Sequence, residues 1–469
     1  RDRLGAEERI RATVSAVQQA TFTVINPATE QAVVDVALTD LAGTDAAIAA
    51  SHEAFQSWKT IAPGERAALL RRFASVVDAH IDELAELEVR NAGHTLGNAR
   101  WEAGNVRDCL NYYSGSPERM LGKQIPVAGG TDITFYEPLG VVGVLVPRNF
   151  PMPIAGWGFA PALAAGNTVV LKPAEITPLT AIRLGELALE AGLPEHVFTV
   201  IPGKGSIVGE RFVTHELVRK VVFTGSTEVG KRVMAGCADQ VKAVTLELGG
   251  KSSNIVFADA DIAAAAASAP YAVFDNAGQD CCARSRILVE RSAYDEFLAG
   301  LEKAVSALRV IDPADEASEM GPMVSAGQMA SVQGYLDEVE VAFAGSKPDG
   351  AGWWLAPSVV TVDDPATRIW REEVFGPVVA VMPFDDEADA VAKANDSEYG
   401  LSGSIFTNDL GRGLRVARAV EAGNLSVNSH SSVRYWTPFG GYKQSGLGRE
   451  LGPDAPMAFT EEKNVFIAH

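Results

Sequence analysis

Short apolar runs alternate with amphipathic segments along most of this 469-residue chain, and that alternation constrains the fold more than any other feature. Residues 141–146 are a continuous apolar run, typical of a strand buried on both faces of a sheet. An Ala-rich helical segment at 154–165, a strand at 168–171 and a helix at 179–191 follow. Strands separated by helices and by short Gly/Pro breaks predict an α/β fold with a parallel, doubly wound sheet.

A second series of the same kind starts near residue 254. Two further strands at 197–201 and 220–223 end the first series, and the strands of the second series are expected at 254–257, 286–289, 378–381 and 404–406. A chain of 469 residues exceeds what one hydrophobic core usually serves, so we expect two or three domains.

The part of the chain before the first sheet has a helical texture. Apolar residues recur at steps of three and four through 66–87, which predicts one amphipathic helix. Residues 44–58 predict another helix, with Thr44 or Asp45 as its N-cap. The side chains that we expect to face inward from it are Ile48, Phe55 and Trp58.

Charge and cysteine content exclude several classes of protein. The 60 acidic and 40 basic side chains give a net charge of −20, which repels phosphate backbones and anionic lipid, so we expect no nucleic-acid and no membrane partner. Four cysteines are too few for a disulfide framework and lack zinc-type spacing, so we expect no metal and a cytoplasmic location. The first residue is Arg1 and not Met, which leaves open whether residues precede it.

Residues 221–231, VVFTGSTEVGK, combine a strand, a Gly-Ser turn and the start of a helix. Backbone N–H groups and the positive end of a helix favour a phosphate at such a turn. The spacing of Gly225, Gly230 and Lys231 fits most of a nucleotide-triphosphatase loop, but Arg232 stands where that loop needs a magnesium-binding Ser or Thr. The segment indicates either a phosphate site without that metal ligand or a Gly-rich connection that binds nothing.

Three polar residues stand in surroundings that suit catalysis. Cys281 follows a Gly-containing turn, where backbone dipoles stabilise a thiolate, although a cysteine in a mixed sequence is commonly a small buried hydrophobe. Glu247 lies between Leu246 and Leu248, and apolar neighbours raise the pKa of a carboxylate toward that of a general base. An ion-paired or solvated glutamate is the plainer interpretation. Asn149 would ordinarily be a turn residue.

Together these segments belong to an ordered set of seven motifs. The motifs are VPRNFP, LKPAE, FTGSTEVG, LELGGKS, GQDCCA, EEVFGPV and PFGGYKQSGLGRE. In this order the chain resembles the NAD(P)-dependent aldehyde dehydrogenase superfamily, from residues 26–28 almost to its C-terminus. Cys281 also follows Glu247 by 34 positions (281 − 247), which matches the hydrolytic, non-acylating members.

The resemblance implies oxidation of an aldehyde to a carboxylic acid. Cys281 would be the nucleophile, and the Asn149 amide and the Cys281 backbone N–H would hold the oxyanion of the thiohemiacetal. Loss of a hydride to nicotinamide would leave a thioester, which water activated by Glu247 would hydrolyse. Relatives that transfer the acyl group to coenzyme A usually lack a carboxylate there, so Glu247 favours hydrolysis. An acylating semialdehyde dehydrogenase and a catalytically silent relative are the alternatives.

The same resemblance implies a site for NAD. Lys172 and Glu175 match residues that hold the adenosine ribose, and a carboxylate at 175 would repel a 2′-phosphate, which favours NAD over NADP. The positions that match the pyrophosphate site are Gly205, Gly225 and Ser226, and those at the nicotinamide are Glu373 and Phe375. Arg148 departs from the family, which usually has Trp there, and this departure puts the cofactor affinity in doubt.

The substrate pocket is less well defined by the resemblance. Positions that match the access tunnel of the family are Asn105, Phe150, Ile154, Trp157, Asp275, Asp280 and the stretch 431–436, which contains Arg434 and Trp436. Two carboxylates near the mouth, Asp275 and Asp280, favour a polar or ω-amino aldehyde. Arg434 favours a carboxylated semialdehyde instead, unless it pairs with one of those carboxylates.

The implied architecture has a Rossmann-type cofactor domain, an α/β catalytic domain and a small β element for oligomerisation. We expect the NAD-binding domain at 1–123 and 139–247, the catalytic domain at 248–440 and the oligomerisation element at 124–138 and 441–469. Residues 124–138 predict an exposed strand or hairpin, whose unpaired edges the sheet of a partner would satisfy. We expect a homodimer or a homotetramer, and the sequence does not choose between them.

Overall fold

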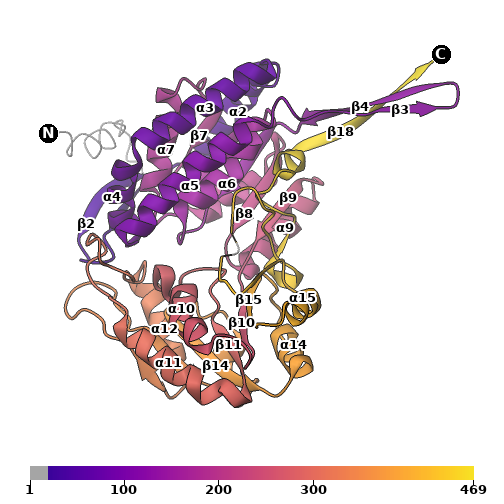
Figure 1. The fold of residues 1–469 in the computed structure, drawn as a ribbon. Coiled ribbons are helices and arrows are strands. Elements are labelled where there is room, and N and C mark those ends of the chain that lie inside the picture. The colour runs from indigo at the N-terminus through magenta and orange to yellow at the C-terminus, as the bar shows by residue number, and fades with distance from the viewer. Residues whose placement is uncertain (1–19, 432) are drawn as a thin grey trace.

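The computed structural model describes residues 20–431 and 433–469, and two large sheets divide these residues into two lobes (Figure 1). The first nineteen residues of the predicted NAD-binding domain lie outside the described residues, as does Ser432 of the predicted substrate stretch. Both sheets are mainly parallel and helices cover them, so the predicted α/β class is confirmed.

The sheet of the first lobe has six strands in the order β17-β9-β8-β5-β6-β7. These are β5 (Val141–Leu145), β6 (Thr168–Lys172), β7 (Phe198–Val200), β8 (Val218–Thr224), β9 (Ala243–Glu247) and β17 (Gly446–Leu447). All but β17 run parallel, and every residue of β5 and β6 is buried. The sheet is flanked by α6 (Pro151–Ala164), α7 (Leu179–Glu190), α8 (Glu210–Thr214) and α9 (Thr227–Ala238).

The second lobe holds a seven-stranded sheet in the order β12-β13-β14-β11-β10-β15-β16. Its strands are β10 (Ser253–Val256), β11 (Arg286–Glu290), β12 (Phe343–Ala344), β13 (Ser358–Thr361), β14 (Val378–Phe384), β15 (Ser402–Phe406) and β16 (Asn424–Val427). Its helices are α10 (Ile262–Phe274), α11 (Tyr294–Ala307), α12 (Ala326–Leu336), α13 (Arg368–Arg371), α14 (Glu387–Asn395) and α15 (Leu410–Ala419). In Figure 1, α10 to α12 lie on one side of this sheet, and α14 and α15 on the other.

The predicted helix at 66–87 is wrong, because two helices occupy that stretch. They are α3 (Pro63–Ala79) and α4 (Ile81–Ala92), and His80 between them has a non-helical backbone. Both helices bury their apolar side in the first lobe, so the three-and-four spacing continues across the break and conceals it. Asp82 and Glu83 in the first turn of α4 favour a new helix start there.

The helix predicted at 44–58 begins earlier than expected. It is α2 (Leu41–Trp58), and its N-cap is Asp40, whose carboxylate accepts a hydrogen bond of 2.8 Å from the Gly43 N–H. Thr44 and Asp45 therefore lie inside the helix. The predicted inward side chains are confirmed as buried: Ile48, Phe55 and Trp58. The helix α5 (Leu96–Ser114) packs between α3 and α6.

Two smaller β elements complete the chain. The hairpin β1 (Thr21–Ile25) and β2 (Ala32–Ala37) lies beside α4. An arm projects from the first lobe and consists of β3 (Gln124–Val127), β4 (Gly130–Pro138) and β18 (Thr460–Ala468) (Figure 1). Nine residues of β18 pair antiparallel with β4, from Thr460 opposite Pro138 to Ala468 opposite Gly130. The C-terminal end of the chain is therefore an edge strand of this arm.

The carboxyl ends of the first sheet face the second lobe. Asn149 follows β5, Ser226 follows β8 and Glu247 is the last residue of β9. Parallel α/β sheets bind ligands at this edge, since neighbouring loops diverge there and leave a crevice.

Candidate active site

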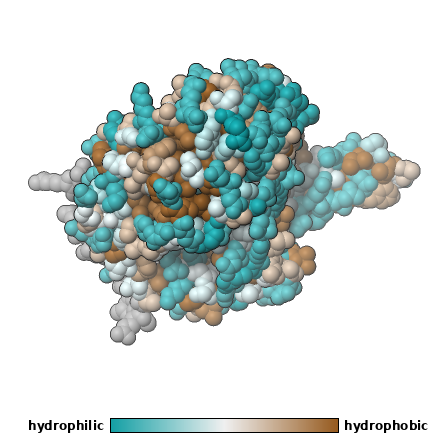
Figure 2. All heavy atoms as spheres, turned by 90° about the horizontal axis from the view of Figure 1, so that it is seen from below, coloured by the Kyte–Doolittle hydropathy of each residue, from teal (hydrophilic) through white to brown (hydrophobic). Residues whose placement is uncertain are grey.

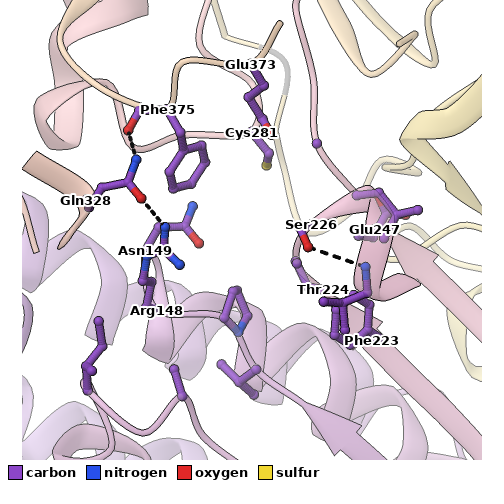
Figure 3. A pocket seen from close by; sticks show the side chains of 18 of the residues that line it. Arg148, Asn149, Phe223, Thr224, Ser226, Glu247, Cys281, Gln328, Glu373 and Phe375 are labelled. Carbon is purple, nitrogen blue, oxygen red and sulfur yellow. Dashed lines mark hydrogen bonds between the residues drawn. The ribbon is translucent and has the colours of Figure 1, made fainter. Parts of the chain in front are cut away.

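A cavity of about 590 Å³ lies between the lobes at this edge. Its walls include Asn149 and Glu247 from the first lobe and Cys281 from the second (Figure 3). The three predicted catalytic residues, which are far apart in the sequence, thus line one cavity.

A second cavity of about 540 Å³ adjoins the first and lies within the first lobe. The two share walls at Val146, Lys172, Phe223, Thr224 and Val229. The pair forms an elongated space with Cys281 near one end only, because Cys281 does not line the second cavity.

Cys281 is presented by a strained turn after α10. Asn276 and Ala277 both have left-handed backbone, with φ of 50° and 53°, and Gly278 follows at 70°. A Cβ on Gly278 would lie 2.0 Å from the carbonyl oxygen of Gly376, so only glycine fits there. Left-handed backbone at non-glycine residues costs free energy and is concentrated at functional sites.

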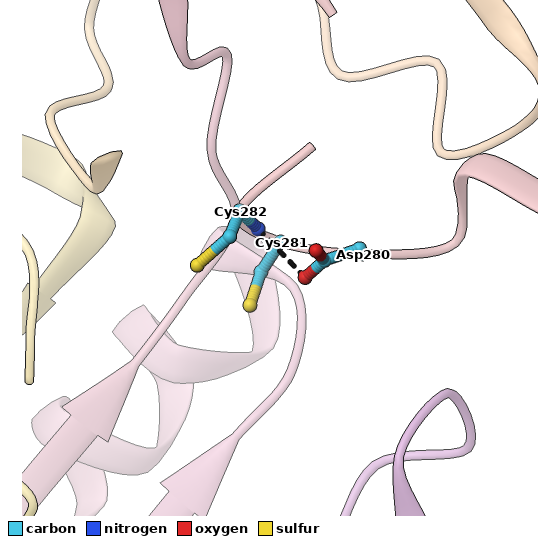
Figure 4. A group of neighbouring side chains, drawn as sticks. All are labelled: Asp280, Cys281 and Cys282. Atoms are coloured by element: carbon cyan, nitrogen blue, oxygen red, sulfur yellow. Dashed lines mark hydrogen bonds between the residues drawn. The ribbon is translucent and has the colours of Figure 1, made fainter. Parts of the chain in front are cut away.

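The thiol of Cys281 is protonated at neutral pH in this state of the protein. A hydrogen bond with the neighbouring Cys282 and burial raise its pKa well above the ordinary value, and the charges of Asp280 and Glu373 add to the effect. The Asp280 carboxylate is turned back over the loop, where it accepts a 2.9 Å hydrogen bond from the Cys282 N–H (Figure 4). Proton removal must therefore accompany any nucleophilic use of Cys281.

Asn149 is fixed by hydrogen bonds to the nucleophile turn. Its side-chain amide donates to the Gln279 carbonyl at 2.9 Å, and its own carbonyl accepts from the Asn276 amide at 2.7 Å. One of the two amide hydrogens of Asn149 is used in this way, and the second is available for an oxygen in the cavity.

Glu247 is buried, and neither of its carboxylate oxygens has a hydrogen-bond partner among the described residues. Burial raises its pKa well above the ordinary value, and the nearby charges of Glu450 and Cys282 raise it further, against the opposing effect of Arg449. A raised pKa makes a carboxylate a stronger base, which suits it to accept a proton from water.

Glu450 is a neighbour that the sequence reasoning missed. It is buried without a side-chain partner within the described part of the chain, and burial raises its pKa to about 8, with Lys220 acting in the opposite direction. Burial also lowers the pKa of Lys220 to about 8. The available signal was the charged residue at the end of the Gly-rich motif PFGGYKQSGLGRE.

The residues predicted to bind the adenosine end meet where the two cavities join. Lys172 lines both cavities, and burial lowers its pKa to about 8. Glu175 lines the first cavity, and its carboxylate accepts a 2.9 Å hydrogen bond from the N–H of Gly205, which lines the second. Ser226 caps α9 by accepting from the Val229 N–H at 3.4 Å, so the positive end of this helix faces the first cavity.

The opposite end of the first cavity is lined by Glu373, Phe375 and Arg148. Glu373 accepts a 2.9 Å hydrogen bond from the Gly250 N–H, and burial raises its pKa to about 7. Gly225 lies on the facing wall. All the residues predicted for the cofactor line one or both of the adjoining cavities.

A separate pocket of about 360 Å³ contains part of the predicted substrate site. It is lined by Asn105, Arg434 and Trp436, together with Tyr435 and Asp108. Arg434 donates to the Ser431 carbonyl at 3.5 Å, and no carboxylate partner of it is found among residues 20–431 and 433–469. It pairs with neither Asp275 nor Asp280.

The other predicted substrate residues lie deeper. Trp157 donates to Asn105 at 2.8 Å, and Ile154 is buried on the same helix. Asp275 does not line the pocket; it accepts from Asn98, near a buried hydrogen bond between His94 and Glu102. The ring of Phe150 lies 5.7 Å from that of His94. Arg434 is thus a charged residue of the pocket lining, whereas neither Asp275 nor Asp280 lines the pocket.

No helix within the described ranges, 20–431 and 433–469, is both long and apolar enough to cross a bilayer.

Comparison with known proteins gives a consistent result. The sequence profile of the aldehyde dehydrogenase family matches residues 14–465. An aldehyde dehydrogenase of Emericella nidulans is 40% identical over 460 residues, which cover 96% of this chain and 93% of that protein. A phenylacetaldehyde dehydrogenase of Pseudomonas fluorescens is 40% identical over 473 residues, covering 97% and 94%. The crystal structure of betaine aldehyde dehydrogenase from Staphylococcus aureus with NAD⁺ superposes with a TM-score of 0.94 at 36% identity, covering 97% of this chain and 92% of that one.

Proposed function

This chain belongs to the aldehyde dehydrogenase family, and on that premise we propose that it uses NAD and water to oxidise an aldehyde to a carboxylic acid. The observation that carries the proposal is that Cys281, Asn149 and Glu247 line one cavity, although 132 positions separate the first and last of them in the sequence (281 − 149).

The first step is attack of the Cys281 sulfur on the aldehyde carbon. An S–C bond forms, the thiol proton passes to solvent water, and the carbonyl oxygen becomes the oxyanion of a thiohemiacetal. The free amide hydrogen of Asn149 and the Cys281 backbone N–H stabilise this oxyanion; one such donor is typically worth about 10²–10³ in rate. When bound, NAD supplies the acceptor for the hydride that leaves the substrate carbon, and the product on Cys281 is a thioester.

Glu247 acts in the second step. Its carboxylate takes a proton from water, the water oxygen attacks the thioester carbon, and the S–C bond breaks to release the carboxylic acid and restore the thiol. Its raised pKa supports this role, because it makes the carboxylate a better acceptor for the proton of water.

The cavities fit NAD by the chemistry of their donors. Carboxylates at Glu175 and Glu373 suit the hydroxyls of the two riboses, and the capped N-terminus of α9 suits the pyrophosphate. Lys172 and Gly205 complete the adenosine end. The Glu175 carboxylate would repel a 2′-phosphate, which supports NAD over NADP.

A CoA-dependent acylating reaction is the second candidate. It needs no base for water, whereas Glu247 is kept buried without a partner in the described structure, at a cost in free energy. That cost supports the hydrolytic reaction.

The substrate proposed is a polar aldehyde. Asn105, Arg434 and Tyr435 give the pocket polar groups where a fatty aldehyde would need an apolar lining. Turnover of aminobutyraldehyde, succinic semialdehyde, hexanal and benzaldehyde, measured side by side, tests this assignment. The highest kcat/KM with hexanal would contradict it.

We propose the cofactor domain at 20–123 and 139–247, the catalytic domain at 248–440 and the oligomerisation element at 124–138 and 441–469. Exposed apolar side chains on the arm support a homodimer or homotetramer (Figure 2): Ile125, Val127, Phe135, Val465, Phe466 and Ile467. Four free cysteines support a reducing, cytoplasmic location. A monomeric mass by light scattering at micromolar protein would contradict the assembly.

The reaction is tested in ¹⁸O-labelled water with NAD and an aldehyde, with and without coenzyme A. We expect NADH and a carboxylate with at least one ¹⁸O atom in both cases, since hydrolysis adds one and exchange of the aldehyde oxygen with water can add a second. NADH formation only with coenzyme A, together with an acyl-CoA product, would establish the acylating reaction instead. No NADH with any aldehyde would identify a catalytically silent protein.

A further inference from the structure

Arg148 makes a bridge between the two lobes. It lies in the turn between β5 and α6, and its guanidinium donates to the side chain of Gln328 on α12. The Gln328 amide in turn donates to the Phe375 carbonyl at 2.9 Å (Figure 3). The guanidinium carbon also lies 5.7 Å from the centre of the Phe375 ring, within the range of a cation–π interaction. These contacts hold Arg148 in one orientation beside the first cavity.

Most of the hydrogen-bonding capacity of this arginine is unused. A guanidinium has five N–H donors, and one of those of Arg148 reaches Gln328. The Nε–H is buried and has no partner within the described chain. A buried donor without a partner costs free energy unless a ligand oxygen accepts its hydrogen bond. Arg148 lines the cavity, so a bound ligand can reach those of its donors that are not buried.

The charged residues around the cavity indicate which kind of ligand oxygen would accept a hydrogen bond from Arg148. Of the described residues that line it, only Arg148 and Lys172 are cationic, whereas Glu175, Glu247 and Glu373 are acidic. A dinucleotide brings two phosphate charges into this acidic space. Lys172 is engaged with the Pro173 carbonyl at 2.7 Å. Arg148 is therefore the better placed cation for a phosphate.

The position of Arg148 indicates which of the two phosphates it would contact. Lys172 lines both cavities, but Arg148 lines only the one that contains Cys281. Burial lowers the pKa of its guanidinium and the nearby carboxylate of Glu373 raises it. Glu373 likewise lines the first cavity and not the second. The phosphate next to the nicotinamide ribose is nearer to this end than the phosphate on the adenosine ribose.

We propose that Arg148 is a ligand of the pyrophosphate of NAD, at the phosphate on the nicotinamide side. This inference rests on the proposed function of the cavity as an NAD site. Guanidinium groups bind phosphate through two parallel N–H donors, which a tryptophan at this position cannot supply. The substitution that sets this chain apart from the family thereby becomes an added phosphate contact.

The test measures binding and not turnover. Isothermal titration of AMP, ADP, ADP-ribose and NAD is carried out on the wild type, Arg148→Met and Arg148→Lys. We expect Arg148→Met to lower the affinity for ADP, ADP-ribose and NAD at least about tenfold, as for loss of a charged hydrogen bond. The affinity for AMP, which lacks the second phosphate, should fall less than threefold. Arg148→Lys keeps the positive charge but lacks the paired N–H donors of a guanidinium. Its affinities should therefore lie between those of the wild type and of Arg148→Met.

Arg232→Met is the matched control. Arg232 lines the second cavity, is 65% exposed and pairs with Glu210 at 3.5 Å. Its removal should leave the ratio of the AMP and ADP affinities within twofold of the wild-type ratio.

Three outcomes would overturn the inference: no loss of affinity for any of the four ligands in Arg148→Met, a loss that begins only with ADP-ribose, or equal losses for AMP and ADP. The second would assign Arg148 to the ribose, and the third to general packing, which a lower melting temperature would accompany. Failure of the wild type to bind NAD would instead contradict the proposed function itself.

Discussion

The cavity at Cys281 and the pocket at Arg434 are built in opposite ways. In the cavity Asn149 and Glu247 are buried and Cys281 is half-buried, and the carboxylate of Glu247 has no partner among the described residues. In the pocket, Arg434, Trp436 and Trp101 are exposed, and Arg107 is paired with two carboxylates, Asp78 and Asp108. Burial strengthens electrostatic effects and exposure screens them. Changes in the cavity should therefore affect the chemistry strongly, and changes in the pocket should alter selectivity modestly.

The largest effect is expected at the nucleophile. Cys281→Ala should lower kcat for NADH formation by at least about 10⁴-fold, because loss of a covalent nucleophile removes the whole reaction path. The adjacent Cys282→Ala is the control, and it should keep at least about a tenth of the activity. Near-normal NADH formation in Cys281→Ala would refute the central role of the cavity.

A different signature is expected for Glu247→Gln. Steady-state turnover should fall by about 10²–10⁴-fold, the usual contribution of a general base. A burst of NADH close to one per active site should remain, because only thioester hydrolysis is impaired. Stopped-flow absorbance and intact-protein mass of the acyl adduct measure this, with the exposed Glu195→Gln as control. Loss of the burst together with the turnover would place Glu247 in the first step.

The pH dependence tests whether Glu450 acts on Glu247 through charge. Glu247 is active as its carboxylate, so hydrolysis of the thioester rises with pH through its raised pKa. Glu450→Gln removes a negative charge that raises this pKa, so the rising limb should move to lower pH by about half a pH unit or more. The pKa of Glu450 is about 8, so the wild-type group exerts this effect only as the pH approaches and passes that value. An unmoved limb in single-turnover hydrolysis would show that the two groups are not coupled.

The smallest effect is expected in the exposed pocket. Arg434→Gln should raise the ratio of kcat/KM for aminobutyraldehyde to that for succinic semialdehyde by about three- to tenfold, since an exposed charge contributes little. Arg100→Gln is the control, because Arg100 lines the same pocket but is paired with Asp82 and Glu316. A change above 100-fold would mean that the pocket is desolvated when substrate is bound, and would remove the contrast between the two regions.

Sequence reasoning was more successful for the sheets and the cavity at Cys281 than for the pocket at Arg434. Residues 141–146 and 168–171 were predictable as strands, since an apolar run that short is stable only between covered faces. The motifs around Asn149, Glu247 and Cys281 indicated the cavity because each supplies the residue type that its chemistry needs. The break at His80 was not predictable, because both helices bury the same side.

The pocket was harder to predict because its properties depend on partners. Asp275 and Asp280 were expected as charges near the mouth, but they accept hydrogen bonds from Asn98 and the Cys282 N–H. Pairing across 177 positions, as between Asn98 and Asp275, leaves no signal in a single sequence. Glu450 was overlooked for the same reason, since its neighbours Glu247 and Lys220 come from other strands.

The edge position of β18 has a consequence for biosynthesis. Thr460 pairs with Pro138, which lies 322 positions earlier (460 − 138), so β3 and β4 are made long before the strand that completes the arm. The arm is therefore a two-stranded hairpin until β18 joins it. A tag fused directly after His469 would sit at the tip of the arm, whereas a tag placed at the other terminus would leave this strand free to form.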